Sequence, residues 1–164
     1  LVVSGINKGG NLGICALYSG TVSAATEAMV MGVPSNAVSL DTYENPDFRP
    51  AAKFTRKLIP KIFEKGLPEG VVLNINVPPV PESEFAGVAI TRQGKSRVIE
   101  EFDSRKDPRG NTYYWLAGEM FFQETEEDAD CVMISKNYIS IAPIHFDLTH
   151  YPSIDKLKDW KLET

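Results

Sequence analysis

The chain has 164 residues, enough for one domain with one sizeable hydrophobic core. Hydrophobic residues make up 43% of the sequence and charged residues 24%, the balance of an ordinary soluble globular protein. Seventeen basic residues against 22 acidic ones give a formal net charge of −5, which argues against binding to nucleic-acid duplexes or to a membrane, because both need a basic face. A small anionic substrate is compatible with this charge, since a bound cation or a helix N-terminus can supply local positive potential.

The two cysteines and the lack of a signal-peptide or membrane-spanning pattern indicate a cytoplasmic protein. Cys15 and Cys131 form no CxxC pair and have no neighbouring histidine at metal-ligand spacing, which disfavours a zinc site and favours reduced thiols. The sequence has neither a signal-peptide pattern nor an apolar run long enough to cross a membrane. Because it starts inside an apolar β-type run at Leu1 and not at Met, we expect it to be the C-terminal portion of a longer polypeptide.

The first predicted elements are a strand, a glycine-rich loop and a helix. The continuous apolar run at residues 1–3 predicts a buried parallel strand. Residues 4–13 are rich in Gly and Asn and predict a loop in which backbone N–H groups can approach a ligand. Ser19-Gly20-Thr21 opens a predicted helix that continues through residues 22–31 and stops at Gly32.

The next elements repeat this alternation. Strands are predicted at residues 35–40 and 71–77, with an amphipathic helix at residues 51–65 between them. Pro60 should kink that helix or start a new turn. Its predicted buried side consists of Phe54, Leu58, Ile62 and Phe63. Strands and helices at this spacing are typical of a parallel sheet with crossover helices.

The second half is richer in β-structure. Residues 106–111 (KDPRGN) are a strong turn signal between two β-type segments, which predicts a long hairpin over residues 97–116. A strand is also predicted at residues 87–92, and another at residues 138–143 with alternating character. The acidic residues 124–130 predict a solvated charged loop.

Together these elements predict the α/β class: a Rossmann-like, three-layer parallel sheet with a protruding β-hairpin and a C-terminal helix at residues 153–162. We expect one domain, 1–164, incomplete at its N-terminus. Its parts are a parallel α/β part (1–80), a β-rich part (87–146) and a C-terminal segment (147–164). Ligands of open parallel sheets bind beyond the carboxyl ends of the strands, where the loop at residues 4–13 lies.

Two asparagines and a helix start are the candidate binding groups. The side chains of Asn7 and Asn11 could each offer an oxygen to a hard cation or an amide to a phosphoryl oxygen, although Asn is also simply a good turn former. Ser19, Gly20 and Thr21 combine hydroxyl donors with the free N–H groups of a helix N-terminus, which suits a phosphate. An ordinary N-cap would use the same residues.

Other catalytic motifs are missing from the sequence. It contains no GxxxxGK[ST], no GxGxxG and no GxSxG, which disfavours a P-loop enzyme, a dinucleotide-dependent oxidoreductase and a serine hydrolase. Its two histidines, His145 and His150, have no other metal-ligand candidate near them in sequence, so we expect structural or solvated roles for both.

The chain resembles the SurE survival-protein (nucleotidase) family. VSGINKGGNLG at residues 3–13 and YSGTVSAATEA at residues 18–28 match the family signature V-S-G-I-N-x-G-x-N-x-G followed by Y-S-G-T-V-x-A-A. The resemblance continues through NINVP, TRQG, DPRGNTYYW and YISIAPIHFDLT to residue 149.

This resemblance implies a metal-dependent phosphatase that hydrolyses nucleoside 5′- and 3′-monophosphates. It implies one divalent cation per subunit, Mg²⁺ or Mn²⁺, with Asn7 as a metal ligand. Asn11, Ser19, Gly20 and Thr21 would then surround the phosphate. The family's adjacent Asp pair and Ser ligand have no counterpart here, so no catalytic acid is assigned and the isolated chain is expected to be inactive. A homodimer or homotetramer is implied, assembled through the hairpin and the C-terminal segment. The alternative is a catalytically incomplete nucleotide-binding or oligomerisation fragment.

Overall fold

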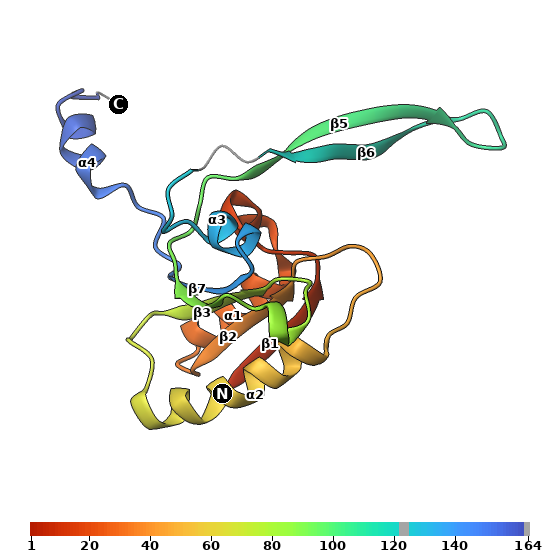
Figure 1. The fold of residues 1–164 in the computed structure, drawn as a ribbon. Helices are drawn as coiled ribbons and strands as arrows, with labels where there is room; N and C mark the ends of the chain where they lie inside the picture. Colours follow the sequence, from red (N-terminus) through yellow and green to blue (C-terminus); the bar gives the residue numbers. More distant parts are fainter. Residues whose placement is uncertain (122–124, 163–164) are drawn as a thin grey trace.

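The computed structural model describes residues 1–121 and 125–162, and its centre is a five-stranded sheet (Figure 1). The strands lie in the order β1 (Val2–Lys8), β2 (Ser35–Leu40), β3 (Val72–Val77), β7 (Tyr138–Ile144) and β4 (Gly87–Ile90). Three of the pairings are parallel, and β3 pairs with β7 in the antiparallel sense. The predicted α/β class, with a mainly parallel sheet, is confirmed.

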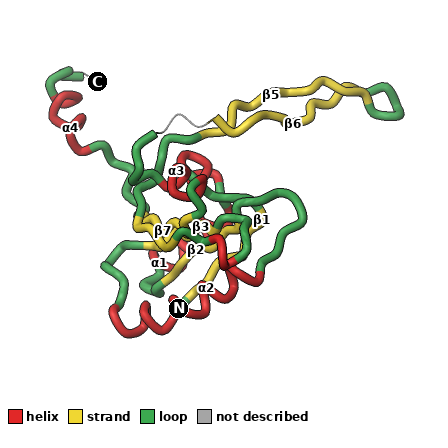
Figure 2. Tube along the Cα trace, viewed as in Figure 1, coloured by secondary structure: helices red, strands yellow, loops and turns green. Residues whose placement is uncertain are grey.

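Helices cover the sheet on both faces and make the predicted three layers (Figure 2). α2 (Arg49–Lys65) lies over an aliphatic face, where Phe54 and Leu58 pack against the core. The buried apolar residues of the core between this face and α2 are Val38, Leu40, Ala51, Ile75, Val77, Ile139 and Ile141. Burial of these apolar side chains between the strands and α2 drives the collapse of the domain.

The opposite face, under α1 (Gly20–Val30), is small and polar. Ala37 and Val72 pack there against Val22 and Ala25 of the helix. The hydroxyl of Ser35 donates a 2.6 Å hydrogen bond to the carbonyl of Ala25, which holds the middle of α1 against β2. Further along the same face, the fully buried polar residues are Ser39, Asn74, Asn76 and Ser140. The sheet therefore offers a row of hydrogen-bonding groups beneath the segment that carries the predicted site.

Two predictions for β1 and its loop are wrong. The strand does not end at Val3 but continues to Lys8, because residues 7 and 8 pair with Ser39 and Leu40 of β2 beyond an irregularity after Ser4. Nor is it fully buried: Val3 is 39% exposed, since β1 is an edge strand of the described sheet. A short 3₁₀ helix that was not predicted, η1 (Gly13–Tyr18), begins where the predicted loop ends.

Other predicted elements hold with local differences. α1 begins one residue after Ser19, and β2 has the predicted bounds. α2 continues through Pro60, and Phe63, predicted to be buried, is 68% exposed. Another short 3₁₀ helix, η2 (Glu82–Glu84), precedes β4. The predicted acidic loop ends at Ala129, because Asp130 opens helix α3 (Asp130–Ser135); Glu124 lies outside the described residues.

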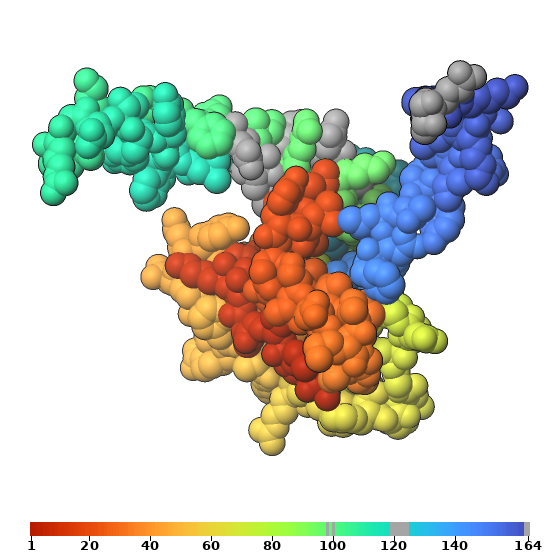
Figure 3. Space-filling model, turned by 180° about the vertical axis from the view of Figure 1, so that it is seen from behind, coloured from red at the N-terminus to blue at the C-terminus, as the bar shows by residue number. Residues whose placement is uncertain are grey.

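Two arms project from the body on opposite sides (Figure 3). One is the predicted hairpin, formed by β5 (Arg97–Lys106) and β6 (Thr112–Phe121), which extends to residue 121 and so beyond the predicted residue 116. The other carries the predicted C-terminal helix, α4 (Tyr151–Lys158), which begins two residues before the predicted residue 153 and ends four residues before the predicted residue 162. Apolar side chains on both arms are exposed, among them Phe102, Tyr114, Trp115, Leu157 and Trp160. None of the helices in the described ranges is long and apolar enough to span a membrane.

Candidate active site

Asn7 lies at the carboxyl end of β1 and its side-chain oxygen faces the start of α1. The amide nitrogen donates to the carbonyl of Gly9 at 2.8 Å, which leaves the oxygen Oδ1 directed away from the loop. Thr21 Oγ1 donates to that oxygen at 3.3 Å, a long hydrogen bond. Asn7 is only half-buried, so its oxygen is a neutral ligand of the type that hard cations accept.

Gly5 makes this placement of Asn7 possible. Its φ of +128° lies in a region that side chains rarely adopt, and a Cβ there would stand 2.3 Å from the carbonyl oxygen of Val38. The strand irregularity between Ser4 and Asn7 therefore depends on glycine. Past it, Asn7 pairs with Ser39 and reaches the edge of the sheet where ligands of α/β proteins bind.

The start of α1 is an open donor site. Ser19 caps the helix by accepting a 3.2 Å hydrogen bond from the N–H of Val22, and its hydroxyl hydrogen remains available to a ligand. Gly20 is exposed, and a Cβ at that position would meet nothing within 4 Å. The first N–H groups of a helix have no intrahelical acceptor and carry the positive end of the dipole. Residues 19–21 can therefore hold an anion next to Asn7.

Asn11 lies elsewhere, in a buried network with the polar face of the sheet. Its amide nitrogen donates to Ser39 Oγ at 2.6 Å, and its N–H donates to Asn76 Oδ1 at 2.8 Å. Its carbonyl accepts 2.8 Å and 3.3 Å bonds from the amides of Asn74 and Asn76. The structure thus brings Asn7 and Thr21 together, whereas the side-chain amide of Asn11 is directed at the sheet.

Two residues after β2 approach the loop and were not predicted as site residues. Asp41 accepts a hydrogen bond from the N–H of Gly10, and burial raises the pKa of Asp41 while that bond lowers it. The ring of Tyr43 lies where a Cβ on Gly9 would stand, 2.5 Å from the nearest ring carbon. The pKa of the Tyr43 hydroxyl is raised mainly by burial, and the nearby Cys15 and Asp41 raise it further. Their position after a strand adjacent to β1 was the available signal.

Asp130 was also missed, because it was assigned to a solvated loop. Its side chain is fully buried and accepts hydrogen bonds from the N–H groups of Gly13, Gly94 and Cys131. Burial raises the pKa of Asp130, and these three bonds oppose that effect. The apolar Cys131-Val132 pair that follows it in sequence was the one local sign of burial.

The described residues supply only part of a metal site. Among residues 1–121 and 125–162, no three His, Cys, Asp or Glu side chains stand close enough together to hold a metal ion. Asn7 fits as one oxygen ligand, but a neutral amide alone binds a divalent cation weakly. His145 and His150 make local contacts in the C-terminal segment: Nδ1 of His145 accepts from the N–H of Asp147, and Nδ1 of His150 lies 2.6 Å from Ser153 Oγ.

Comparison with known proteins identifies close relatives. The sequence model of the family described as "Survival protein SurE" matches residues 1–100. The chain is 48% identical over 162 residues to "5'-nucleotidase SurE" of Syntrophobacter fumaroxidans, covering 99% of this chain and 65% of that protein. It is 54% identical over 162 residues to the protein of the same name from Syntrophus aciditrophicus, covering 96% and 60%.

A solved structure agrees with the fold. The crystal structure of the SurE protein from Aquifex aeolicus superposes with a TM-score of 0.81 at 38% sequence identity, covering 98% of this chain and 65% of that one. The chain therefore spans 60% to 65% of the length of these relatives.

Proposed function

This chain belongs to the SurE family, and we propose that the complete protein is a metal-dependent phosphatase that hydrolyses nucleoside 5′- and 3′-monophosphates. Two relatives that share about half of its sequence are named 5'-nucleotidases. The observation that carries the proposal is the contact between Asn7 and Thr21, because it places an oxygen ligand directly beside an open helix N-terminus.

We propose Asn7 as one ligand of a single divalent cation, Mg²⁺ or Mn²⁺. When bound, such a cation offsets the negative charge that develops on a phosphoryl group during hydrolysis. The half-buried Oδ1 of Asn7 suits this role because the amide nitrogen is already fixed by Gly9. Carboxylate ligands would come from the part of the complete protein that the relatives contain and this chain does not.

The residues of this chain would bind and orient the phosphate. The hydroxyls of Ser19 and Thr21 and the N–H groups at the start of α1 would donate to phosphoryl oxygens, and Gly20 leaves room for their approach. Asn11, assigned to the phosphate by the resemblance, would act through its carbonyl and N–H, which fasten the loop to Asn74 and Asn76. The two free cysteines agree with a reducing compartment such as the cytoplasm.

An assay of phosphate release tests this proposal. The complete gene product and the 164-residue chain would each be given 5′- and 3′-nucleoside monophosphates, with Mg²⁺, with Mn²⁺ and with a chelator. We expect metal-dependent release from the complete protein and none from the shorter chain. Hydrolysis that survives the chelator would contradict metal dependence, and full activity from the 164 residues would contradict a missing set of ligands.

The hairpin favours a second function, the assembly of a homodimer or homotetramer. Phe102, Tyr114, Trp115 and Leu116 are all more than half exposed on β5 and β6. A two-stranded hairpin is marginally stable in water by itself, and clustered exposed apolar side chains mark contact surfaces. Phe102, Tyr114 and Leu116 share one face of the hairpin, because Phe102 pairs with Leu116 and Tyr114 lies two residues away on the same strand. We expect Leu116→Ser to lower the molar mass measured by light scattering, whereas Lys106→Ser at the end of β5 should leave it unchanged. An unaltered mass for the leucine variant would contradict assembly through this surface.

A further inference from the structure

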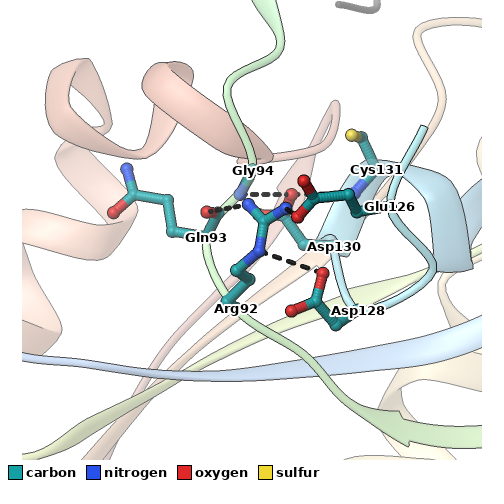
Figure 4. Close-up of polar contacts among 7 residues, drawn as sticks. All are labelled: Arg92, Gln93, Gly94, Glu126, Asp128, Asp130 and Cys131. Atoms are coloured by element: carbon teal, nitrogen blue, oxygen red, sulfur yellow. Dashed lines mark hydrogen bonds and ion pairs between the residues drawn. The ribbon is translucent and has the colours of Figure 1, made fainter. Parts of the chain in front are cut away.

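Asp130 is a fully buried carboxylate whose hydrogen bonds join three separate segments. Figure 4 shows its bonds to Gly94 and Cys131. Its Oδ2 accepts from the N–H of Gly13 at 2.9 Å, and its Oδ1 accepts from the N–H of Gly94 at 3.0 Å and of Cys131 at 2.7 Å. Gly13 is 117 positions away in sequence and Gly94 is 36. Only the contact with Cys131 is local, so capping of the short helix α3 does not account for the arrangement.

Backbone and side-chain bonds hold the same segments together around the carboxylate. The N–H of Ile14 donates to the carbonyl of Ser96 at 2.9 Å, and the N–H of Asp130 donates to the carbonyl of Arg92 at 3.0 Å. Gln93 Nε2 donates to the carbonyl of Gly13 at 2.8 Å. The start of η1, residues 92–96 and the start of α3 therefore form one tightly bonded joint.

The fit of this joint leaves no space for larger residues. A Cβ on Gly94 would stand 2.7 Å from Asp130 Oδ1, and a Cβ on Gly13 would stand 2.3 Å from Ser96 Oγ. The neighbouring cation, Arg92, forms ion pairs with the exposed Glu126 and Asp128. The charge of Asp130 is thus balanced mainly by main-chain N–H groups, which hold a carboxylate in a fixed orientation.

The joint connects the hairpin to the candidate phosphate site. Residues 92–96 lead directly into β5, and residues 125–130 return from the hairpin to α3. On its other side, Gly13 begins η1, which ends at Tyr18, immediately before Ser19 caps α1. A shift of Gly13 would therefore move the start of α1 relative to Asn7.

We propose that Asp130 is a positioning residue, which fixes the turn at Gly13 so that residues 19–21 face Asn7, and which couples this turn to the base of the hairpin. The proposal rests on the proposed function for the identity of the anion. Asp130 itself touches neither phosphate nor metal. Its effect on binding comes from the hydrogen bond to Gly13.

Two isosteric substitutions in the complete gene product test the proposal. Asp130→Asn replaces one acceptor oxygen by an amide that cannot accept from an N–H group. Asp128→Asn makes the same charge change two residues away, on an exposed side chain. For Asp130→Asn we expect the KM for a nucleoside monophosphate and the inhibition constant of inorganic phosphate to rise about tenfold, with a smaller change in kcat. For Asp128→Asn we expect changes below about twofold.

Hydrogen exchange supplies a readout that loss of stability alone would not produce. The amides of Gly13 and Gly94 should exchange faster in Asp130→Asn than in Asp128→Asn, while amides in the central strands β2 and β3 keep their protection. Equal KM values and equal exchange at Gly13 in the two variants would overturn the proposal.

A third variant decides the question if Asp130→Asn does not fold. Gln93→Met removes the 2.8 Å bond from the Gln93 amide to the Gly13 carbonyl but keeps the length of the side chain. A severalfold rise in KM would support the joint as a positioning device, and an unchanged KM would overturn it.

If the wild-type protein releases no phosphate from any monophosphate, the proposed function fails. The dissociation constant of inorganic phosphate, measured by calorimetry, then tests the role of Asp130 independently of catalysis. Equal dissociation constants for Asp130→Asn and Asp128→Asn would overturn the positioning role of Asp130.

Discussion

The hydroxyl of Thr21 and the side-chain oxygen of Asn7 meet across 3.3 Å, between the first turn of α1 and the carboxyl end of β1. This contact is long for an O–H···O hydrogen bond, so it holds the two elements together weakly. A ligand that offers stronger partners to both groups can therefore replace it at small cost. Under the proposed function, a cation and a phosphate would bind side by side at these two residues.

Replacing Asn7 should impair metal binding and catalysis together. In the complete protein, we expect Asn7→Ala to raise the metal concentration needed for half-maximal activity about tenfold or more and to lower kcat, because one oxygen ligand is lost. Activity measured against metal concentration checks this. Asn111→Ala, the same change at the far end of the hairpin, is the control. An Asn7 variant with wild-type metal dependence would show that the assignment is wrong.

Thr21 should contribute a hydroxyl donor to the phosphate. Thr21→Val keeps the shape of the side chain but removes that donor, and we expect the KM to rise about tenfold because hydrogen bonds to charged groups are worth about 1.5–3 kcal/mol. Thr21→Ser keeps the hydroxyl and should stay within about threefold of wild type. Steady-state kinetics of the three proteins, at one metal concentration, distinguish these outcomes. Equal KM values for the Val and Ser variants would exclude a role for the hydroxyl.

Gly5 should be important for the stability of the fold. A Cβ at Gly5 would meet the Val38 carbonyl at 2.3 Å, and the φ of +128° adds strain, so we expect Gly5→Ala to destabilise the protein by about 3 kcal/mol. Denaturant unfolding of the 164-residue chain measures this free energy. Gly20→Ala is the matched control, since a Cβ there meets nothing within 4 Å. A Gly5 variant as stable as the Gly20 variant would contradict the steric argument.

The stability of the start of α4 should depend on pH through the ionisation of Asp147. The Thr149 hydroxyl, the Tyr151 hydroxyl and the Thr149 N–H donate to this carboxylate and lower its pKa to about 2. Because the folded-state pKa lies below the unfolded value, the stabilisation is present above the unfolded pKa and is lost as the pH falls toward 2. A carboxyl-carbon NMR titration should find this low pKa, and Tyr151→Phe should raise it. A titration near pH 4 in the wild-type protein would contradict these contacts.

Local signals in the sequence predicted the elements whose ends are fixed by local chemistry. Ser19 caps α1, and the Asp-Pro-Arg-Gly turn at residues 107–110 closes the hairpin, so both could be located from residue type and spacing alone. β2 was predicted with the correct bounds because Gly32 and Pro34 end the preceding helix and the apolar residues Ala37, Val38 and Leu40 follow.

Features that depend on distant partners were missed for a physical reason. β1 extends to Lys8 only because β2 pairs with it, and Asp130 is buried only because Gly13 and Gly94 supply N–H groups from 117 and 36 positions away. Neither partner is visible in a local window of sequence. The motif at residues 3–13 identified Asn7 as a candidate, but the direction of the Asn11 side chain depends on its bond to Ser39 Oγ of β2, 28 positions away.

The polar face of the sheet also restricts the register in which the strands can pair. Asn74 and Asn76 lie on the α1 side of β3, while Ile75 and Val77 lie on the aliphatic side under α2. A pairing of β3 that slipped by one residue would turn both amides toward Phe54 and Leu58 and leave them without acceptors. Each such slip would cost several kcal/mol, of the order of a domain's whole stability. The side-chain amides of Asn74 and Asn76, which bind the loop at Asn11, therefore also favour the observed register of the central strands over registers shifted by one residue.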